Sequence, residues 1–201
     1  MARPPRFTTE SILDAAATAA VARWREATVD DVASLLHTPA NSIYYRFPSK
    51  HALFGSLWLR AIQRFQAGLL PALAHDDATT AAVDAAAHIP SFCRENPADA
   101  IAMTLYRQQD LVTLVDGPLR DEIRHVNDGV AAGMAALATR LYGRSDVQVL
   151  EFVAVACQES GYAFVRRYLR ADTDLPHWID AAVRASCLAI LGLGPPAPAL
   201  P

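Results

Sequence analysis

Apolar residues recur at helical spacing along most of this chain, and no segment shows the strict apolar–polar alternation of a half-buried β-strand. The first helical pattern follows two threonines, either of which can cap a helix, and it ends near Arg25. Thr28 and Asp31 have the spacing of a capping box. This spacing predicts a second helix that starts at Val29.

The residues after this second helix predict a tight turn, a third short helix and then a long helix. The turn covers residues 37–39, and Pro39 takes the first helical position, which suits its fixed φ and missing N–H. The third helix runs to about Tyr45. Ser49 can cap the fourth helix, whose apolar stripe extends to Pro71. Two short helices joined by a tight turn are the shape that fits a helix into the DNA major groove.

The rest of the chain predicts further helices, bounded by proline, glycine and capping residues. They cover about residues 79–94, 97–109, 117–142, 146–170 and 176–191. The final segment, GLGPPAPALP, contains too much proline to be helical. The sequence therefore predicts an all-α protein with a helix-turn-helix domain in residues 1–50, a larger helical domain in residues 51–194 and a proline-rich tail in residues 195–201.

Composition limits the class of protein. Hydrophobic residues make up 52% of the 201 residues and charged ones 19%, which allows a sizeable core and excludes wholesale disorder. Charged residues interrupt every apolar run before it reaches the length of a membrane span, and the N-terminus has no apolar signal region. We therefore expect a cytoplasmic protein with no membrane partner.

Charge and cysteine content narrow the function further. The net charge of −3 argues against a protein that coats nucleic acid non-specifically, but residues 1–50 carry six basic and five acidic residues, a small basic excess at the expected DNA end. Cys93, Cys157 and Cys187 are far apart and form no metal-binding pattern. We interpret them as small buried residues, with a redox sensor as the alternative, and expect no metal and no cofactor. No spacing suggests a nucleophile and its base, so an enzyme is not expected.

Three motifs occur in a familiar order: ILDAA at residues 12–16, TVDDVA at 28–33 and SIYYRFPSKHALF at 42–54. Together they resemble the N-terminal domain of the TetR family of bacterial transcriptional regulators, over about the first quarter of the chain. The chain departs from the family at two usual glycines. Residues 24–27 replace the glycine of the first loop, and His37 replaces that of the turn before the third helix, where histidine tolerates a positive φ.

The resemblance implies DNA contacts from the third helix and its flanks. Asn41 and Ser42 are expected to reach base edges, since asparagine can pair with adenine. Tyr44 and Lys50 correspond to residues that bind phosphate in the family. The full set of expected DNA-binding residues is Thr28, Ala40, Asn41, Ser42, Tyr44, Tyr45, Arg46 and Lys50.

The neighbouring residues have other roles. Ala40 can contact a thymine methyl group, and Thr28 can add a backbone N–H contact to phosphate at a helix N-terminus. Arg3 and Arg6 either enter a minor groove or belong to a solvated tail. Ile43 and Phe47 are expected to be core residues only.

The resemblance also implies a homodimer, formed by the last two long helices, on double-stranded pseudo-palindromic operator DNA. A pocket for a small effector would lie in the helical body. Gln158 and Glu159 interrupt an apolar helix, and a buried polar side chain needs a partner, either a ligand or a residue such as Arg107 or Arg124. The expected ligand-binding residues are Trp58, Phe92, Met103, Tyr106, Gln158, Glu159 and Tyr162, with Phe65, His88 and Phe152 as further candidates, although each alone can equally be plain core.

Two functions follow from this interpretation. The first is a dimeric repressor released from its operator by a small apolar or aromatic ligand. The alternative is a DNA-binding regulator that has no small-molecule ligand and is partner-controlled or an activator.

Overall fold

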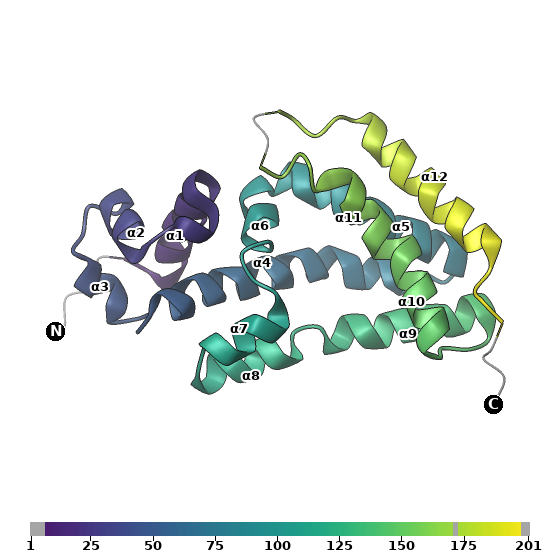
Figure 1. The fold of residues 1–201 in the computed structure, drawn as a ribbon, viewed down its shortest axis with the longest axis horizontal. Coiled ribbons are helices and arrows are strands. Elements are labelled where there is room, and N and C mark those ends of the chain that lie inside the picture. The colour runs from purple at the N-terminus through teal and green to yellow at the C-terminus, as the bar shows by residue number, and fades with distance from the viewer. Residues whose placement is uncertain (1–6, 171–172, 198–201) are drawn as a thin grey trace. The chain divides into compact units, whose positions relative to one another are not determined.

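A computed structural model describes residues 7–170 and 173–197. All regular elements in these residues are helices, which confirms the all-α prediction (Figure 1). The expected basic arm at Arg3 and Arg6 and the end of the tail lie outside the described residues. Contacts divide the chain into two compact units, one of residues 1–63 and 98–126 and one of residues 64–97 and 127–201. The first unit therefore includes much more than the 1–50 segment expected to bind DNA.

The first unit is built on short helices packed beside the start of a long one. It contains α1 (Thr9–Arg23), a 3₁₀ turn (Trp24–Glu26), α2 (Val29–Leu35), α3 (Ala40–Tyr44), the first part of α4 (Lys50–Leu73), α6 (Pro97–Ala102, from its second residue on), α7 (Gln108–Leu114) and α8 (Gly117–His125). One buried cluster joins α1, α2, α3 and α4, and includes Ile12, Val32, Ile43 and Phe54. A second cluster around Trp58 and Leu111 joins α4 to α7 and α8.

The helix starts follow local capping chemistry. The Thr8 hydroxyl accepts the Ser11 N–H at 3.1 Å, and the Ser49 hydroxyl accepts the Ala52 N–H at 3.0 Å. These caps confirm the predicted starts of α1 and α4. The fourth helix extends two residues beyond Pro71, which lies inside it.

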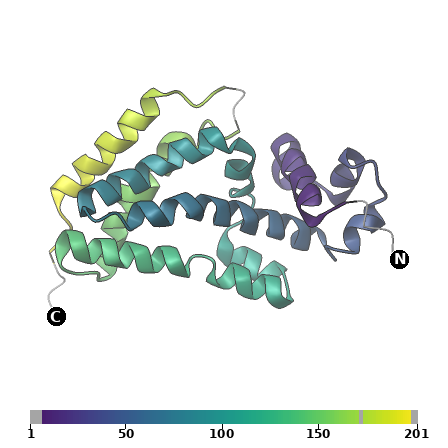
Figure 2. The same cartoon turned by 180° about the vertical axis from the view of Figure 1, so that it is seen from behind.

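The second unit packs its helices around one apolar cluster. It contains the rest of α4, α5 (Ala78–Glu95), α9 (Asp128–Tyr142), α10 (Val147–Ala154), a π-helical turn (Val155–Glu159), α11 (Ser160–Val165) and α12 (Trp178–Leu193). The views from both sides show α12 running along α5, and these two helices are in contact with α11 (Figure 2). Cys157 and Cys187 are fully buried, as expected, and burial raises the pKa of Cys93 to about 11, which disfavours its reactive thiolate.

Three long helices expected in the second half of the chain are interrupted. The helix expected over 97–109 stops at Ala102, because the Thr104 hydroxyl bonds to the Ile101 carbonyl at 2.7 Å and the Trp58 indole N–H takes the Met103 carbonyl at 3.1 Å. These side chains compete for backbone carbonyls that a continuous helix would use.

The second interruption has the same kind of cause. The helix expected over 117–142 breaks at residues 126–127, where the Gln108 side-chain amide donates to the carbonyls of Ile123 and Arg124 at 2.8 and 3.1 Å. The helix expected over 146–170 widens into the π-helical turn and ends at Val165. No helix in the described ranges is both long enough and apolar enough to cross a bilayer.

Candidate nucleic-acid interface

The turn between α2 and α3 has the conformation expected of it. His37 adopts a φ of 49°, which confirms that histidine stands in for a glycine there. The N–H groups of His37 and Thr38 donate to the carbonyls of Ser34 and Ala33 at 3.1 and 3.0 Å and close the turn. Pro39 has an extended ψ of 142° and is the N-cap of α3, so the prediction that it takes the first helical position was wrong by one residue.

Helix α3 has one buried side and one that faces solvent. Ile43 and Phe47, four residues apart, are 1% and 6% exposed and fix the helix to the core, as expected. Asn41, Ser42 and Tyr44 are exposed, and Tyr45 is 92% exposed. Ala40 is half-buried and packs against the core. The buried anchors thus turn hydrogen-bonding and aromatic side chains outward together.

Thr28 is fully engaged in its capping box. Its hydroxyl donates to the Asp31 carboxylate at 2.7 Å and accepts the Asp31 N–H at 3.1 Å. The Thr28 N–H also donates to that carboxylate, at 2.8 Å. These hydrogen bonds from Thr28, helped by Arg23 at 3.2 Å, hold the pKa of Asp31 below its usual value. A phosphate at this helix N-terminus would therefore have to use an N–H other than that of Thr28.

The two basic candidates make intramolecular bonds of their own. Arg46, half-buried at the end of α3, donates to the Thr9 hydroxyl at 3.2 Å. Lys50 donates to the Arg25 carbonyl at 3.0 Å, and its ammonium lies 5.9 Å from the centre of the Phe54 ring. Because an ammonium has three N–H donors, Lys50 keeps two for another acceptor.

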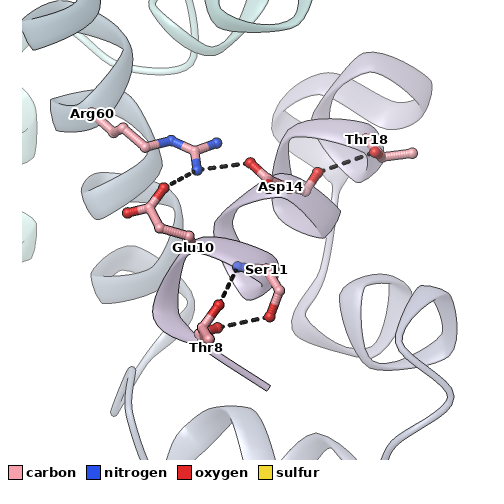
Figure 3. Close-up of polar contacts among 6 residues, drawn as sticks. All are labelled: Thr8, Glu10, Ser11, Asp14, Thr18 and Arg60. Atoms are coloured by element: carbon pink, nitrogen blue, oxygen red, sulfur yellow. Dashed lines mark hydrogen bonds and ion pairs between the residues drawn. The ribbon is translucent and has the colours of Figure 1, made fainter. Parts of the chain in front are cut away.

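One contact that sequence reasoning missed attaches α1 to α4. A single nitrogen of Arg60 donates to the carboxylates of Glu10 at 2.9 Å and Asp14 at 2.8 Å (Figure 3). The Arg60 side chain is 11% exposed, and those of its partners are 65% and 67% exposed. The four-residue spacing of the two acids places them on one face of α1, and that spacing was the available signal.

The sequence of the helix-turn-helix region matches a known family model. Residues 12–57 match the family model of the bacterial regulatory proteins of the tetR family. This segment is a helix-turn-helix domain of the tetR type. Comparison with curated protein sequences gives no significant match.

Solved TetR-family and related structures have the same fold over almost the whole chain. PfmR from Thermus thermophilus is 20% identical, with a TM-score of 0.67 over 90% of this chain and 97% of its own. The ketosteroid transcriptional regulator KstR2 of Mycobacterium tuberculosis is 16% identical, with a TM-score of 0.68 over 96% of each chain. FadR from Bacillus subtilis, solved with stearoyl-CoA, is 14% identical, with a TM-score of 0.64 over 92% of this chain and 98% of its own.

The expected effector-binding residues fall into both compact units. Trp58, Met103 and Tyr106 belong to the first, where the Trp58 indole bonds to the Met103 carbonyl. Tyr106 lines a cavity of about 260 Å³, and its hydroxyl lies 3.3 Å from Nδ1 of His51. Phe92 is buried in the second unit, edge-to-face with Phe65 at 5.2 Å.

The polar candidates of the second unit differ from expectation. Glu159 is exposed and Gln158 is half-buried, so the idea that both are buried polar groups was wrong for Glu159. Tyr162 is 48% exposed. The wider π-helical turn, which helical periodicity does not foresee, lies at this part of the helix. Arg124, suggested as a partner, pairs with Asp121 at 2.9 Å.

Proposed function

We propose that this protein represses transcription as a homodimer on a pseudo-palindromic operator and is released by a small apolar or aromatic ligand. The main support for DNA binding is the solvent-exposed side of α3. Asn41 and Ser42 can hydrogen-bond to base edges, and Tyr44 can donate its hydroxyl to a phosphate. Tyr45, at 92% exposure, offers its ring to sugar or base.

The basic residues support the same proposal. Lys50 has N–H donors to spare for a phosphate, and the half-buried Arg46 lies at the end of the same helix-turn-helix unit. Ala40 contributes little chemistry, so sequence preference rests on Asn41, Ser42 and the shape of the DNA.

Exposed apolar residues of the second unit support dimerisation. Val155 and Tyr162 are 39% and 48% exposed, and on α12 Trp178 and Leu188 are 59% and 48% exposed. Monomeric proteins seldom leave such groups of large apolar side chains in water. A second copy packed on these helices would cover them. Its two-fold symmetry would place two recognition helices about one DNA turn, roughly 34–36 Å, apart.

Phe65 and His88 of the second unit are half-buried, with their rings 4.8 Å apart, and are the kind of aromatic side chains that an apolar or aromatic ligand packs against. Two proteins of the same fold carry names that refer to a ketosteroid and to stearoyl-CoA. These names serve only to choose compounds for screening.

One observation favours the alternative, a regulator with no small ligand. Trp58 and Phe92 are 3% and 4% exposed and are packed against protein neighbours. Side chains that already fill their surroundings leave a ligand nothing to replace. Control would then come from a protein partner, or the protein would act as an activator.

DNA binding is tested with purified protein and the DNA that flanks its own gene, over a series of salt concentrations. Specific, salt-sensitive binding is expected, and Lys50→Met should lower the slope of log affinity against log salt by about 1, the contribution of one phosphate contact. Tyr44→Phe should weaken binding with no change in folding. Arg124→Gln, which removes an exposed charge on α8, is the control and should bind like the wild type. Binding that neither Lys50→Met nor Tyr44→Phe weakens would refute the proposed interface.

The effector is tested by adding stearoyl-CoA, progesterone or salicylate to the preformed protein–DNA complex. A true effector should weaken operator binding by about 5- to 150-fold, the usual range of allosteric coupling. A compound that binds the protein without changing operator affinity does not act as the effector. Failure of a broad panel, with DNA binding intact, would favour the ligand-free alternative.

A further inference from the structure

Trp24 has a backbone conformation that tryptophan seldom adopts. It follows α1 with a φ of 52° and a ψ of −126°, in a region that favours glycine. A bulky residue persists in such a conformation only when its surroundings hold it there. The contacts of Trp24 therefore indicate what the fold requires of this turn.

Besides local bonds with Ala20 and Ala27, Trp24 contacts a residue far along the chain. The Trp24 indole N–H donates to the Thr104 hydroxyl at 2.9 Å, across 80 positions of sequence. The next residue, Arg25, stacks its guanidinium over the Trp24 ring at 4.4 Å and donates to the Thr104 carbonyl at 3.2 Å. Two successive residues after α1 thus bind the hydroxyl and the carbonyl of Thr104.

Thr104 is itself held in place. Its hydroxyl donates to the Ile101 carbonyl at 2.7 Å, and the neighbouring Met103 carbonyl accepts the Trp58 indole N–H at 3.1 Å. The segment between α6 and α7 is therefore hydrogen-bonded to α6 and α4. It also accepts hydrogen bonds from the turn after α1.

The same turn contacts the lysine expected to bind DNA. The Lys50 ammonium donates to the carbonyl of Arg25 at 3.0 Å. Because Arg25 is fixed by its stacking and by Thr104, its carbonyl is a fixed acceptor for Lys50. That bond orients a flexible side chain and leaves two of its N–H donors for phosphate.

We propose that Thr104 is a positioning residue for DNA binding, acting through Trp24 and Arg25 on Lys50. This inference rests on the proposed function, because it assumes that Lys50 binds phosphate. It adds a regulatory consequence. Any shift of the segment 103–106 that breaks the Thr104 contacts frees the turn after α1, so Lys50 loses its fixed acceptor and operator affinity falls.

The test uses the full-length protein and its operator, with Trp24→Phe and Thr104→Val as separate variants. The first removes the indole N–H and reduces the size of the ring, and the second replaces only the hydroxyl by a methyl group. Each should weaken operator binding about threefold to tenfold, the factor that one hydrogen bond contributes. The matched control is Thr113→Val, since the exposed Thr113 hydroxyl donates to the carbonyl three residues earlier at 2.7 Å, as that of Thr104 does. This control should bind like the wild type.

The decisive measurement repeats both variants in a Lys50→Met background. If Thr104 acts through Lys50, the loss should shrink to less than about twofold there, because coupled residues are not additive. A full loss in that background, or wild-type affinity of the single variants, overturns the inference. If Trp24→Phe does not fold, as judged by circular dichroism, Thr104→Val alone decides. If the wild type binds no DNA at all, the proposed function is wrong. This outcome differs from a failure of the inference about Thr104, because it is seen with the wild type before any variant is compared.

Discussion

Gly68 is the position in the second unit where a single methyl group should do most harm. A Cβ there would lie 2.3 Å from Cε1 of His88 and 2.9 Å from both ring nitrogens. The His88 ring cannot simply swing away. Its Nε2 is bonded to the Phe65 carbonyl at 2.8 Å, and the ring lies 4.8 Å from that of Phe65 and 5.8 Å from that of Phe92.

The magnitude follows from these contacts. Moving His88 costs its hydrogen bond, about 1 kcal/mol, and repacking a crowded helix crossing costs about 1–3 kcal/mol. Replacing a helical glycine by alanine returns about 0.5–1 kcal/mol. We therefore expect Gly68→Ala to lower the free energy of unfolding by about 2 kcal/mol. For a chain of this size that corresponds to a fall in Tm of about 4–8 °C.

The assay is thermal and urea unfolding followed by circular dichroism, at one fixed protein concentration because the protein is proposed to dimerise. Gly129→Ala is the matched control, since a Cβ at Gly129 in α9 would meet nothing closer than Leu70 at 3.9 Å. It should be neutral or slightly stabilising. In a His88→Ala background, Gly68→Ala should no longer destabilise. A wild-type Tm for Gly68→Ala, or an undiminished loss without His88, would show that the reasoning is wrong.

Three further predictions concern other contacts. Because the pKa of Asp31 is lowered, its contribution to the free energy of unfolding is complete above the usual carboxyl pKa near 3.8 and is lost as the pH falls through the lowered value. Asp31→Asn should therefore reduce the loss of stability in acid, measured by urea unfolding at a series of pH values. Leu188→Asp should convert the proposed dimer into monomers in light scattering, because it places a charge in the proposed interface. A dimeric mass that does not change would exclude that face. Arg60→Met should lower the free energy of unfolding by no more than about 1 kcal/mol, because its two acidic partners are mostly exposed. A much larger loss would contradict the view that water screens both ion pairs.

The parts of the fold that sequence predicts well depend on neighbouring residues. The starts of α1, α2 and α4 follow from Thr8, Thr28 and Ser49, because each cap bonds to an N–H three residues later. The exposed side of α3 follows from Ile43 and Phe47, whose four-residue spacing fixes which side is buried. Local chemistry decides these features, so one sequence is enough to see them.

Other features depend on partners that are distant in sequence. The breaks after α6 and α8 arise because the Trp58 and Gln108 side chains donate hydrogen bonds to backbone carbonyls of other segments. The residues next to Trp58 and Gln108 in the sequence give no sign of these bonds. The same limit applies to the expected effector-binding residues. Periodicity shows that Phe92 and Glu159 belong to helices, but it does not show which neighbouring helix covers each side, and the first is buried while the second is exposed.

The two non-glycine residues with a positive φ in the described residues, Trp24 and His37, show this difference most clearly. His37 needs a positive φ because of the turn it occupies, and its own turn hydrogen bonds suffice to hold it, so the sequence motif predicts the conformation. Trp24 also has a positive φ, and besides the local bonds of its N–H to the Ala20 carbonyl and of the Ala27 N–H to its own carbonyl, its indole donates to Thr104, 80 residues away. A strained residue with such a distant contact links the two segments that the contact joins. Trp24 is thus better understood as a connection between the α6–α7 segment and the DNA-binding helices than as an imperfect substitute for glycine.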